Sequence, residues 1–160
     1  MQIDDIITPE RIVCNIQVNS KKRALEVISE TLTNSEPELN QQEVFESLLN
    51  RERLGSTSLG HGVALPHGRV KSSDHTLGVF IQLTDGIDFD SIDSQPVDLL
   101  FGLLVPEEST QEHLQILSML AKLFSDEKFR DKLRTLKDSK KIYDLITHWN
   151  AQSANPDEEE

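Results

Sequence analysis

A nearly unbroken run of apolar residues from Val97 to Val105 constrains the fold of this chain more than any other feature. Only Asp98 and Gly102 interrupt it, so it lacks the apolar–polar alternation of a strand with one face in water. It is far too short to span a bilayer, which takes about 20 apolar residues. We therefore interpret it as a central β-strand that is covered on both faces.

Apolar periodicity predicts the elements around this strand. Residues 12–18 and 77–83 have strand character, while residues 55–76, rich in glycine and hydroxyl side chains, are predicted as loop with a short strand at 63–65. Helices are predicted over 21–33, 41–53, 127–137 and 140–149, with another that starts at Ser109 and carries apolar residues to Phe124. Ser20, Asn40, Ser109 and Asp126 are the predicted helix caps, and Glu43 and Glu112 complete two predicted capping boxes. This order predicts an α/β domain, a small mixed β-sheet flanked by helices in three layers.

The length of 160 residues indicates a single domain, which we place at residues 1–150. Residues 151–160 are polar and end in Asp157, Glu158, Glu159 and Glu160. Because this segment has no apolar stripe, we predict that it is a disordered acidic tail.

Charge and cysteine content narrow the class of protein. The net charge of −12 makes nucleic acid and anionic membranes poor partners. Cys14 is the single cysteine, so no disulfide can form within the chain, as is typical of reducing compartments. The N-terminus has no signal-peptide pattern, and no further domain is expected. These features predict a cytoplasmic protein without membrane insertion.

The segment from Arg51 to Arg69 is the candidate site. Its glycines would let backbone amides approach an anion, and Pro66 restricts the backbone directly before His67. Arg51, Arg53 and Arg69 form a basic cluster in an otherwise acidic chain. A histidine aimed into a basic, glycine-rich pocket suits the chemistry of anions, and of phosphoryl groups in particular.

The same residues resemble the IIA domain of the fructose–mannitol class (EIIA type-2) of the bacterial phosphotransferase system. The signature of that family is met by Glu52, Leu59, Gly60, Val63, Ala64, Leu65, Pro66, His67 and Gly68. The chain is most similar to the nitrogen-regulatory branch of the class, although Ser58 and His61 stand where Gly and Asn are frequent in that branch.

The resemblance implies that His67 accepts a phosphoryl group from an HPr-like phosphocarrier protein. It also implies that His113 is a second active-site histidine and that Arg51 contacts the phosphate. A neutral imidazole has one nitrogen with a free lone pair, so His67 is a sensible nucleophile, but the residues leave open which nitrogen reacts. His113 is expected in the first turn of its helix, where the positive helix end favours a nearby phosphate. No cofactor or metal is expected, because a phosphohistidine donor needs neither ATP nor Mg²⁺.

The implied function is a regulator whose phosphorylation state controls the binding of protein targets, such as potassium-transport or sensor-kinase components and nitrogen metabolism. Any transferase activity would be that of a phosphohistidine phosphotransferase component. One alternative is a IIA component that relays phosphate to the IIB domain of a sugar permease. Another is a binding module that has lost phosphorylation, which the intact sequence Pro66-His67-Gly68 argues against.

The other histidines have ordinary interpretations. His75 and His148 are expected to be surface residues, and His61 is expected to fill a loop. A metal site built from His61, His67, His75 and Asp74 is conceivable, but the spacing matches no known ligand pattern.

Overall fold

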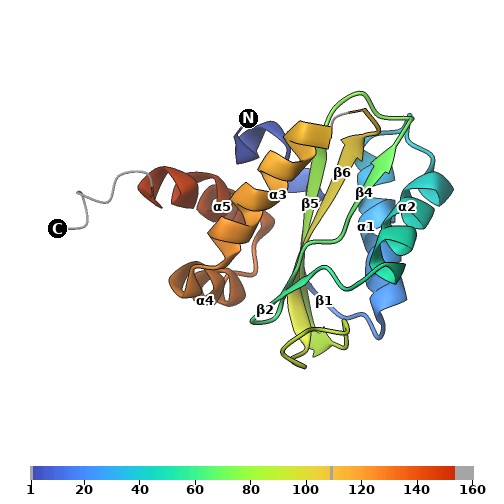
Figure 1. Ribbon diagram of the computed structural model, residues 1–160. Helices are drawn as coiled ribbons and strands as arrows, with labels where there is room; N and C mark the ends of the chain where they lie inside the picture. Colours follow the sequence, from blue (N-terminus) through green and yellow to red (C-terminus); the bar gives the residue numbers. More distant parts are fainter. Residues whose placement is uncertain (1, 109, 154–160) are drawn as a thin grey trace.

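A six-stranded mixed β-sheet with helices on both faces forms the fold of this protein, of which the structure, a computed structural model, describes residues 2–108 and 110–153 (Figure 1). The strands are β1 (Ile12–Ile16), β2 (Ser58–Gly60), β3 (Val63–Ala64), β4 (His67–Val70), β5 (Leu77–Ile87) and β6 (Val97–Pro106). The helices are α1 (Lys21–Ser35), α2 (Gln41–Arg53), α3 (Thr110–Phe124), α4 (Glu127–Thr135) and α5 (Ser139–Ser153), with short 3₁₀ turns at Ile3–Asp5 and Pro9–Arg11.

Strand β6 lies at the centre of the sheet, as its apolar sequence predicts. The strand order is β1-β5-β6-β3-β2, and β4 also pairs with β6. β5 is antiparallel to β6, whereas β3 and β4 are both parallel to it and follow one another along the same edge. Along β6, side chains enter the two hydrophobic cores in turn, with Phe101 and Leu103 on one face and Leu100 and Leu104 on the other.

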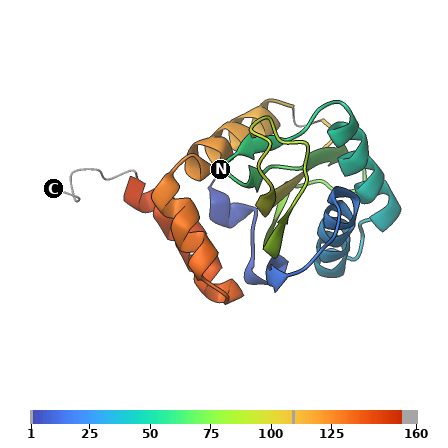
Figure 2. The same ribbon diagram turned by 90° about the horizontal axis from the view of Figure 1, so that it is seen from below.

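The two cores are covered by different helices, which confirms the prediction of three layers. α1 and α2 pack on one face of the sheet, and α3, α4 and α5 pack on the other together with the N-terminal 3₁₀ turns. Figure 2 shows the blue and teal helices α1 and α2 on one side of the strands and the orange helices on the opposite side.

The helix ends agree with most of the predicted capping. The side chains of Ser20, Asn40 and Asp126 each accept a hydrogen bond from a backbone N–H two or three residues further on. Ser109 lies outside the described residues. The Glu43 carboxylate accepts from the Ser72 hydroxyl at 2.6 Å, rather than completing the predicted capping box. α5 continues to Ser153, so the predicted start of a disordered tail at residue 151 is wrong for its first three residues, and residues 154–160 lie outside the described part.

Candidate functional site

His67 is the first residue of β4, where it pairs with Leu103 of β6, so the expectation of a loop position is wrong. Its ring is half-buried, and Nδ1 lies 2.8 Å from the backbone oxygen of Leu65. A carbonyl oxygen can only accept, so Nδ1 carries the proton of the neutral ring and Nε2 keeps a free lone pair. The bond thus leaves Nε2 as the ring nitrogen that can act as a nucleophile.

The surroundings of His67 keep its ring neutral. Burial lowers the pKa of His67 below its ordinary value, because the charged ring loses hydration. The hydrogen bond to Leu65 raises this pKa and the positive charge of Arg51 lowers it, and the net direction is downward. The lone pair on Nε2 is therefore available at neutral pH.

His113 from α3 meets His67 edge to face, with the ring centroids 5.1 Å apart and the planes at 74°. It lies in the first turn of α3, as predicted. The pKa of His113 is lowered to about 4, mainly by burial and in smaller part by the nearby charges of His67, Arg69 and Arg51. The predicted site residues His67 and His113, which are far apart in sequence, are therefore neighbours in space.

Arg69 orients the His113 ring. Its Nε donates to Nδ1 of His113 at 3.4 Å, so the proton of the neutral ring sits on Nε2. This Nε2 is buried and has no hydrogen-bond partner among the described residues. A buried N–H without a partner is costly, and an oxygen acceptor placed beside it would satisfy it. The ring that meets His67 thus presents a donor with no partner among the described residues.

The three arginines of the predicted basic cluster have different positions. Arg51, in the last turn of α2, donates from Nη1 to the Gly55 carbonyl at 2.8 Å and lowers the pKa of both His67 and His113. That bond uses one of the five N–H groups of its guanidinium. Arg53 instead donates to Asn50 at 3.2 Å. The positive charge at the site comes from Arg51 and Arg69.

The role of Arg69 was not assigned from the sequence, although a signal for it exists. His67 and Arg69 are two residues apart in a β-strand, so their side chains project from the same face. That spacing indicates proximity to His67, but the contact to His113 spans 44 positions and depends on the fold.

Glu52 ties the end of α2 to the segment that precedes His67. Its buried carboxylate accepts from the backbone N–H of Thr57 at 3.1 Å and from the Thr57 hydroxyl, and it pairs with Lys21 Nζ at 2.9 Å. The Thr57 carbonyl accepts from the Leu65 N–H at 3.0 Å, and the Leu65 carbonyl accepts from His67. This connected set of bonds gives the acidic position of the signature a structural role that the sequence alone does not reveal.

Three glycines of the segment, Gly60, Gly62 and Gly68, have roles in packing and turns. At Gly68 a Cβ would collide with Ser47, because β4 packs closely against α2. Gly60, His61 and Gly62 all have positive φ and form the turn between β2 and β3. His61 donates its backbone N–H to Asp93 at 2.9 Å, in agreement with its expected role as a loop residue.

The remaining histidines lie elsewhere. His75 contacts Asp74 and Glu36, and His148 bonds to the backbone of its own helix. Within residues 2–108 and 110–153, no cluster of three His, Cys, Asp or Glu side chains could hold a metal ion. None of the helices in that part of the chain is long and apolar enough to cross a membrane.

Comparison with protein families matches residues 5–149 to the family described as phosphoenolpyruvate-dependent sugar phosphotransferase system, EIIA 2. Proteins named "Nitrogen regulatory protein" from Klebsiella oxytoca and Pseudomonas aeruginosa are 43% identical over 148 residues and 39% identical over 146 residues. The alignments cover 92% and 91% of this chain and 91% and 95% of those proteins.

Solved structures agree with the sequence comparison. The structure of nitrogen regulatory protein IIA-Ntr from Neisseria meningitidis is 42% identical, with a TM-score of 0.85 over 91% of this chain and 99% of that one. The structure of IIA mannitol from Escherichia coli is 25% identical, with a TM-score of 0.74 over 88% of this chain and 98% of that one. The sheet and its helical layers are therefore those of this group of proteins.

Proposed function

Because this chain belongs to the EIIA type-2 family of the phosphoenolpyruvate-dependent sugar phosphotransferase system, we propose that it is a phosphoryl-accepting regulator of the nitrogen branch of that system. His67 accepts the phosphoryl group from an HPr-like phosphocarrier, and the phosphorylation state selects the proteins that the chain binds. The observation that carries the proposal is that His67, with Nε2 left free by the bond at Nδ1, meets the ring of His113, whose N–H has no partner among the described residues.

The transfer is a nucleophilic substitution at phosphorus. The lone pair of His67 Nε2 attacks the phosphorus atom of the carrier's phosphohistidine, and the P–N bond of the donor breaks with its electrons returning to the carrier's imidazole. During the attack the proton stays on Nδ1, which donates it in a hydrogen bond to the Leu65 carbonyl, so no separate base is required. Since the P–N bond of the donor is already reactive, the step uses no ATP, metal or cofactor.

The groups around His67 match the charge of a transferring phosphoryl group. Arg51 and Arg69 provide positive charge, and the Nε2–H of His113 provides a neutral donor. Such donors accelerate transfer when they bind the phosphoryl oxygens more tightly in the transition state than in the ground state. We assign Arg51 and His113 to this role and Arg69 to the orientation of His113.

Exposed apolar side chains next to the site support a protein partner. Leu54 is 85% exposed at the end of α2, three residues after Arg51, and Leu114 is 66% exposed directly after His113. Large apolar residues that remain in water beside a reactive group are typical of docking surfaces. The carrier and the regulated proteins would use this surface in turn, in the cytoplasm. We infer that potassium-transport, sensor-kinase or nitrogen-metabolism proteins are among the targets.

The alternative is a relay of phosphate to the IIB domain of a sugar permease. It is favoured by one relative, the PTS system fructose-specific EIIABC component of Bacillus subtilis, which is 31% identical over 147 residues. The alignment covers 91% of this chain but only 23% of that protein. The same acceptor histidine would serve both functions.

The proposal is tested with purified enzyme I, HPr-like carrier and labelled phosphoenolpyruvate. The wild-type chain should take up one acid-labile, alkali-stable phosphate, and His67→Ala should take up none while keeping its circular dichroism spectrum. His61→Ala is the matched control, since His61 lies in a turn, and should be labelled like the wild type. Labelling of His67→Ala would refute the proposal, as would an unlabelled wild type. Rapid passage of the label to an added IIB domain would favour the relay.

A further inference from the structure

Positive charge is concentrated on one part of this acidic chain, away from the candidate site. Residues 127–141, which cover α4 and the start of α5, contain seven Lys or Arg against three Asp or Glu, while the whole chain has a net charge of −12. A local excess of one charge on a molecule of the opposite charge marks a surface for a partner of matching chemistry.

The two arginines of this stretch are engaged within the fold, whereas its lysines keep their ammonium groups out of ion pairs, although Lys137 donates to the Arg134 carbonyl at 3.3 Å. Arg130 is buried and donates to the Phe124 carbonyl at 2.9 Å, and Arg134 pairs with Asp98 at 2.8 Å. The five lysines are all exposed, and none forms an ion pair with a carboxylate in the part of the chain that the structure describes. They are Lys128, Lys132, Lys137, Lys140 and Lys141, and we call them the lysine patch.

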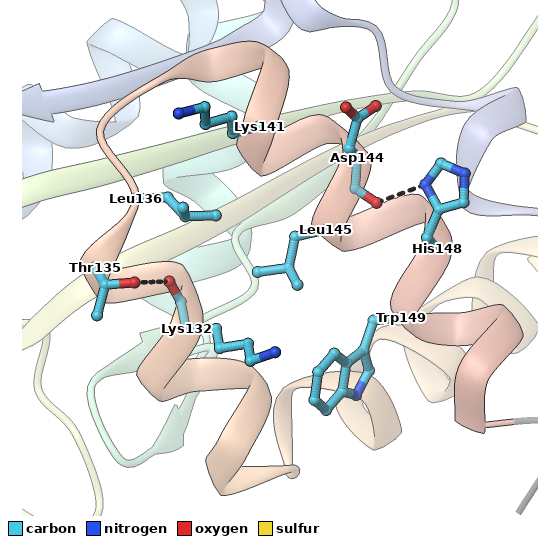
Figure 3. A pocket seen from close by; sticks show the side chains of 8 residues that line it. All are labelled: Lys132, Thr135, Leu136, Lys141, Asp144, Leu145, His148 and Trp149. Atoms are coloured by element: carbon cyan, nitrogen blue, oxygen red, sulfur yellow. Dashed lines mark hydrogen bonds between the residues drawn. The ribbon is translucent and has the colours of Figure 1, made fainter. Parts of the chain in front are cut away.

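An apolar pocket of about 560 Å³ opens between α4 and α5, beside this lysine patch (Figure 3). Leu136, Leu145 and Trp149 are half-buried and form its apolar lining. Lys132 reaches across toward Trp149, with Nζ 5.5 Å from the ring centroid. Lys141 lies on the rim. The volume is large enough for a bulky apolar side chain.

The lysines are the groups of the pocket that remain to recognise a ligand, because other polar groups around it are already hydrogen-bonded within the fold. The Trp149 N–H already donates to Asp126 at 3.2 Å, and His148 Nδ1 bonds to the backbone oxygen of Asp144 at 2.8 Å. The Asp144 carboxylate is the one acidic group in the lining and opposes two lysines. The ammonium group of Lys132 lies near the ring of Trp149, and a second lysine lines the same pocket. Such a surface would bind an apolar group that is flanked by negative charges.

We propose that this pocket docks an acidic segment of a partner protein, with one large apolar side chain against Leu136, Leu145 and Trp149 and with carboxylates on the lysine patch. A polypeptide is favoured over a small anion because Lys128, Lys137 and Lys140 lie outside the pocket lining. An extended segment reaches them, whereas a ligand confined to the cavity does not. No residue of the pocket belongs to the site around His67, so docking here does not depend on phosphorylation.

Trp149 is the only tryptophan of the chain, so its fluorescence reports directly on the pocket. The probe is the peptide acetyl-Glu-Asp-Glu-Phe-Glu-Asp-Glu-amide, titrated into the full chain. A saturable change in emission is expected, and it should be lost when the peptide's Phe is replaced by Ala. The double variant Lys132→Ala/Lys141→Ala should weaken binding about tenfold, because two exposed ion pairs with the peptide are lost. Lys22→Ala/Lys71→Ala is the charge-matched control and should bind like the wild type.

Other occupants give different results. Titration without saturation, or equal weakening by both double variants, would overturn the proposal. A full-length variant with Asp157→Asn and Glu158, Glu159 and Glu160 each changed to Gln tests the chain's own end as the occupant. If that change alone shifts Trp149 emission and the peptide still fails to bind, the proposal is overturned. Concentration-dependent dimerisation that is abolished by Lys132→Ala would instead identify a second copy as the occupant.

Discussion

The hydrogen bond from His67 Nδ1 to the Leu65 carbonyl decides, at the scale of single residues, which ring nitrogen can react. A comparable bond fixes His113, where Arg69 occupies Nδ1 and leaves Nε2–H without a partner. Both histidines are neutral for the same physical reason, since burial disfavours their charged forms. The site is prepared for a negatively charged group by orientation and nearby arginines rather than by charged imidazoles.

The lowered pKa values predict how stability depends on pH. Above about pH 6.5 His67 and His113 are mostly neutral in both the folded and the unfolded chain. Below that pH the two histidines bind protons in the unfolded chain more readily than in the folded chain. For His113 this difference persists down to about pH 4. The free energy of unfolding should therefore fall as the pH is lowered from 6.5 to 4. In urea titrations across this range, the free energy of unfolding of His113→Gln should depend less steeply on pH than that of the wild type. An equal slope in the two proteins would contradict the burial of a neutral His113.

The assigned donors predict the kinetics of transfer from the carrier. Arg51→Ala and His113→Ala should each slow single-turnover phosphorylation of His67 by roughly ten- to a thousandfold, as expected for a lost transition-state donor. Lys22→Ala removes an exposed positive charge elsewhere and serves as the control. Wild-type rates in both site variants would show that neither residue contacts the phosphoryl group.

Some secondary-structure elements could be read from the sequence and others could not. The apolar run of β6 and the caps Ser20 and Asp126 are strong local signals, because they reflect burial and backbone bonds within a few residues. The short strand predicted at 63–65 matches β3, whereas β2 and β4, with three and four residues, are too short for a periodic pattern. β2 pairs with β3 and β4 pairs with β6, and these pairings form only in the fold. The position of His67 on a strand could not be predicted for this reason, although the signature located the residue itself.

The bonds of Glu52 predict that it stabilises the connection between α2 and β2. Glu52→Ala leaves the Thr57 N–H without its acceptor and Lys21 without its buried partner, which should lower the free energy of unfolding by about 1–3 kcal/mol. Transfer to His67 should slow as well, because Leu65 is held through Thr57. Glu46→Ala, at an exposed position on the same helix, should stay within about 0.5 kcal/mol of the wild type in urea titrations. Equal effects of the two substitutions would refute this role.

For the molecule as a whole, charge is distributed unevenly. The chain is strongly acidic, yet it carries positive charge at Arg51 and Arg69 beside His67 and on the lysine patch of α4 and α5. These two regions lie on different elements, so a partner could contact one without covering the other. Net charge and composition predicted the unfavourable classes of partner, and the sequence indicated the arginine cluster around His67. The fold was needed to place Arg69 against His113 and to place an apolar pocket beside the lysine patch.

Phosphorylation at His67 should change partner affinity through charge. A phosphoryl group adds about two negative charges to the region beside Arg51 and Arg69. A target whose contact surface is acidic or apolar should bind the phosphorylated chain more weakly, and the difference should shrink at high salt. His67→Asp should have an intermediate effect, because a carboxylate has one charge and a shorter reach. Calorimetry of the three forms at two salt concentrations checks this, and equal affinities would leave only the relay of phosphate.

The central claim is that Nε2 of His67 accepts the phosphoryl group, and NMR of the phosphorylated chain tests it most directly. With ¹⁵N-labelled histidine and phosphorylation by the carrier under alkaline conditions, coupling between ³¹P and ¹⁵N identifies the bonded nitrogen. We expect a single phosphohistidine, on Nε2 of His67, the nitrogen that the Nδ1 bond to Leu65 leaves free. Phosphate on Nδ1 of His67, or on any of the other four histidines, would contradict the account.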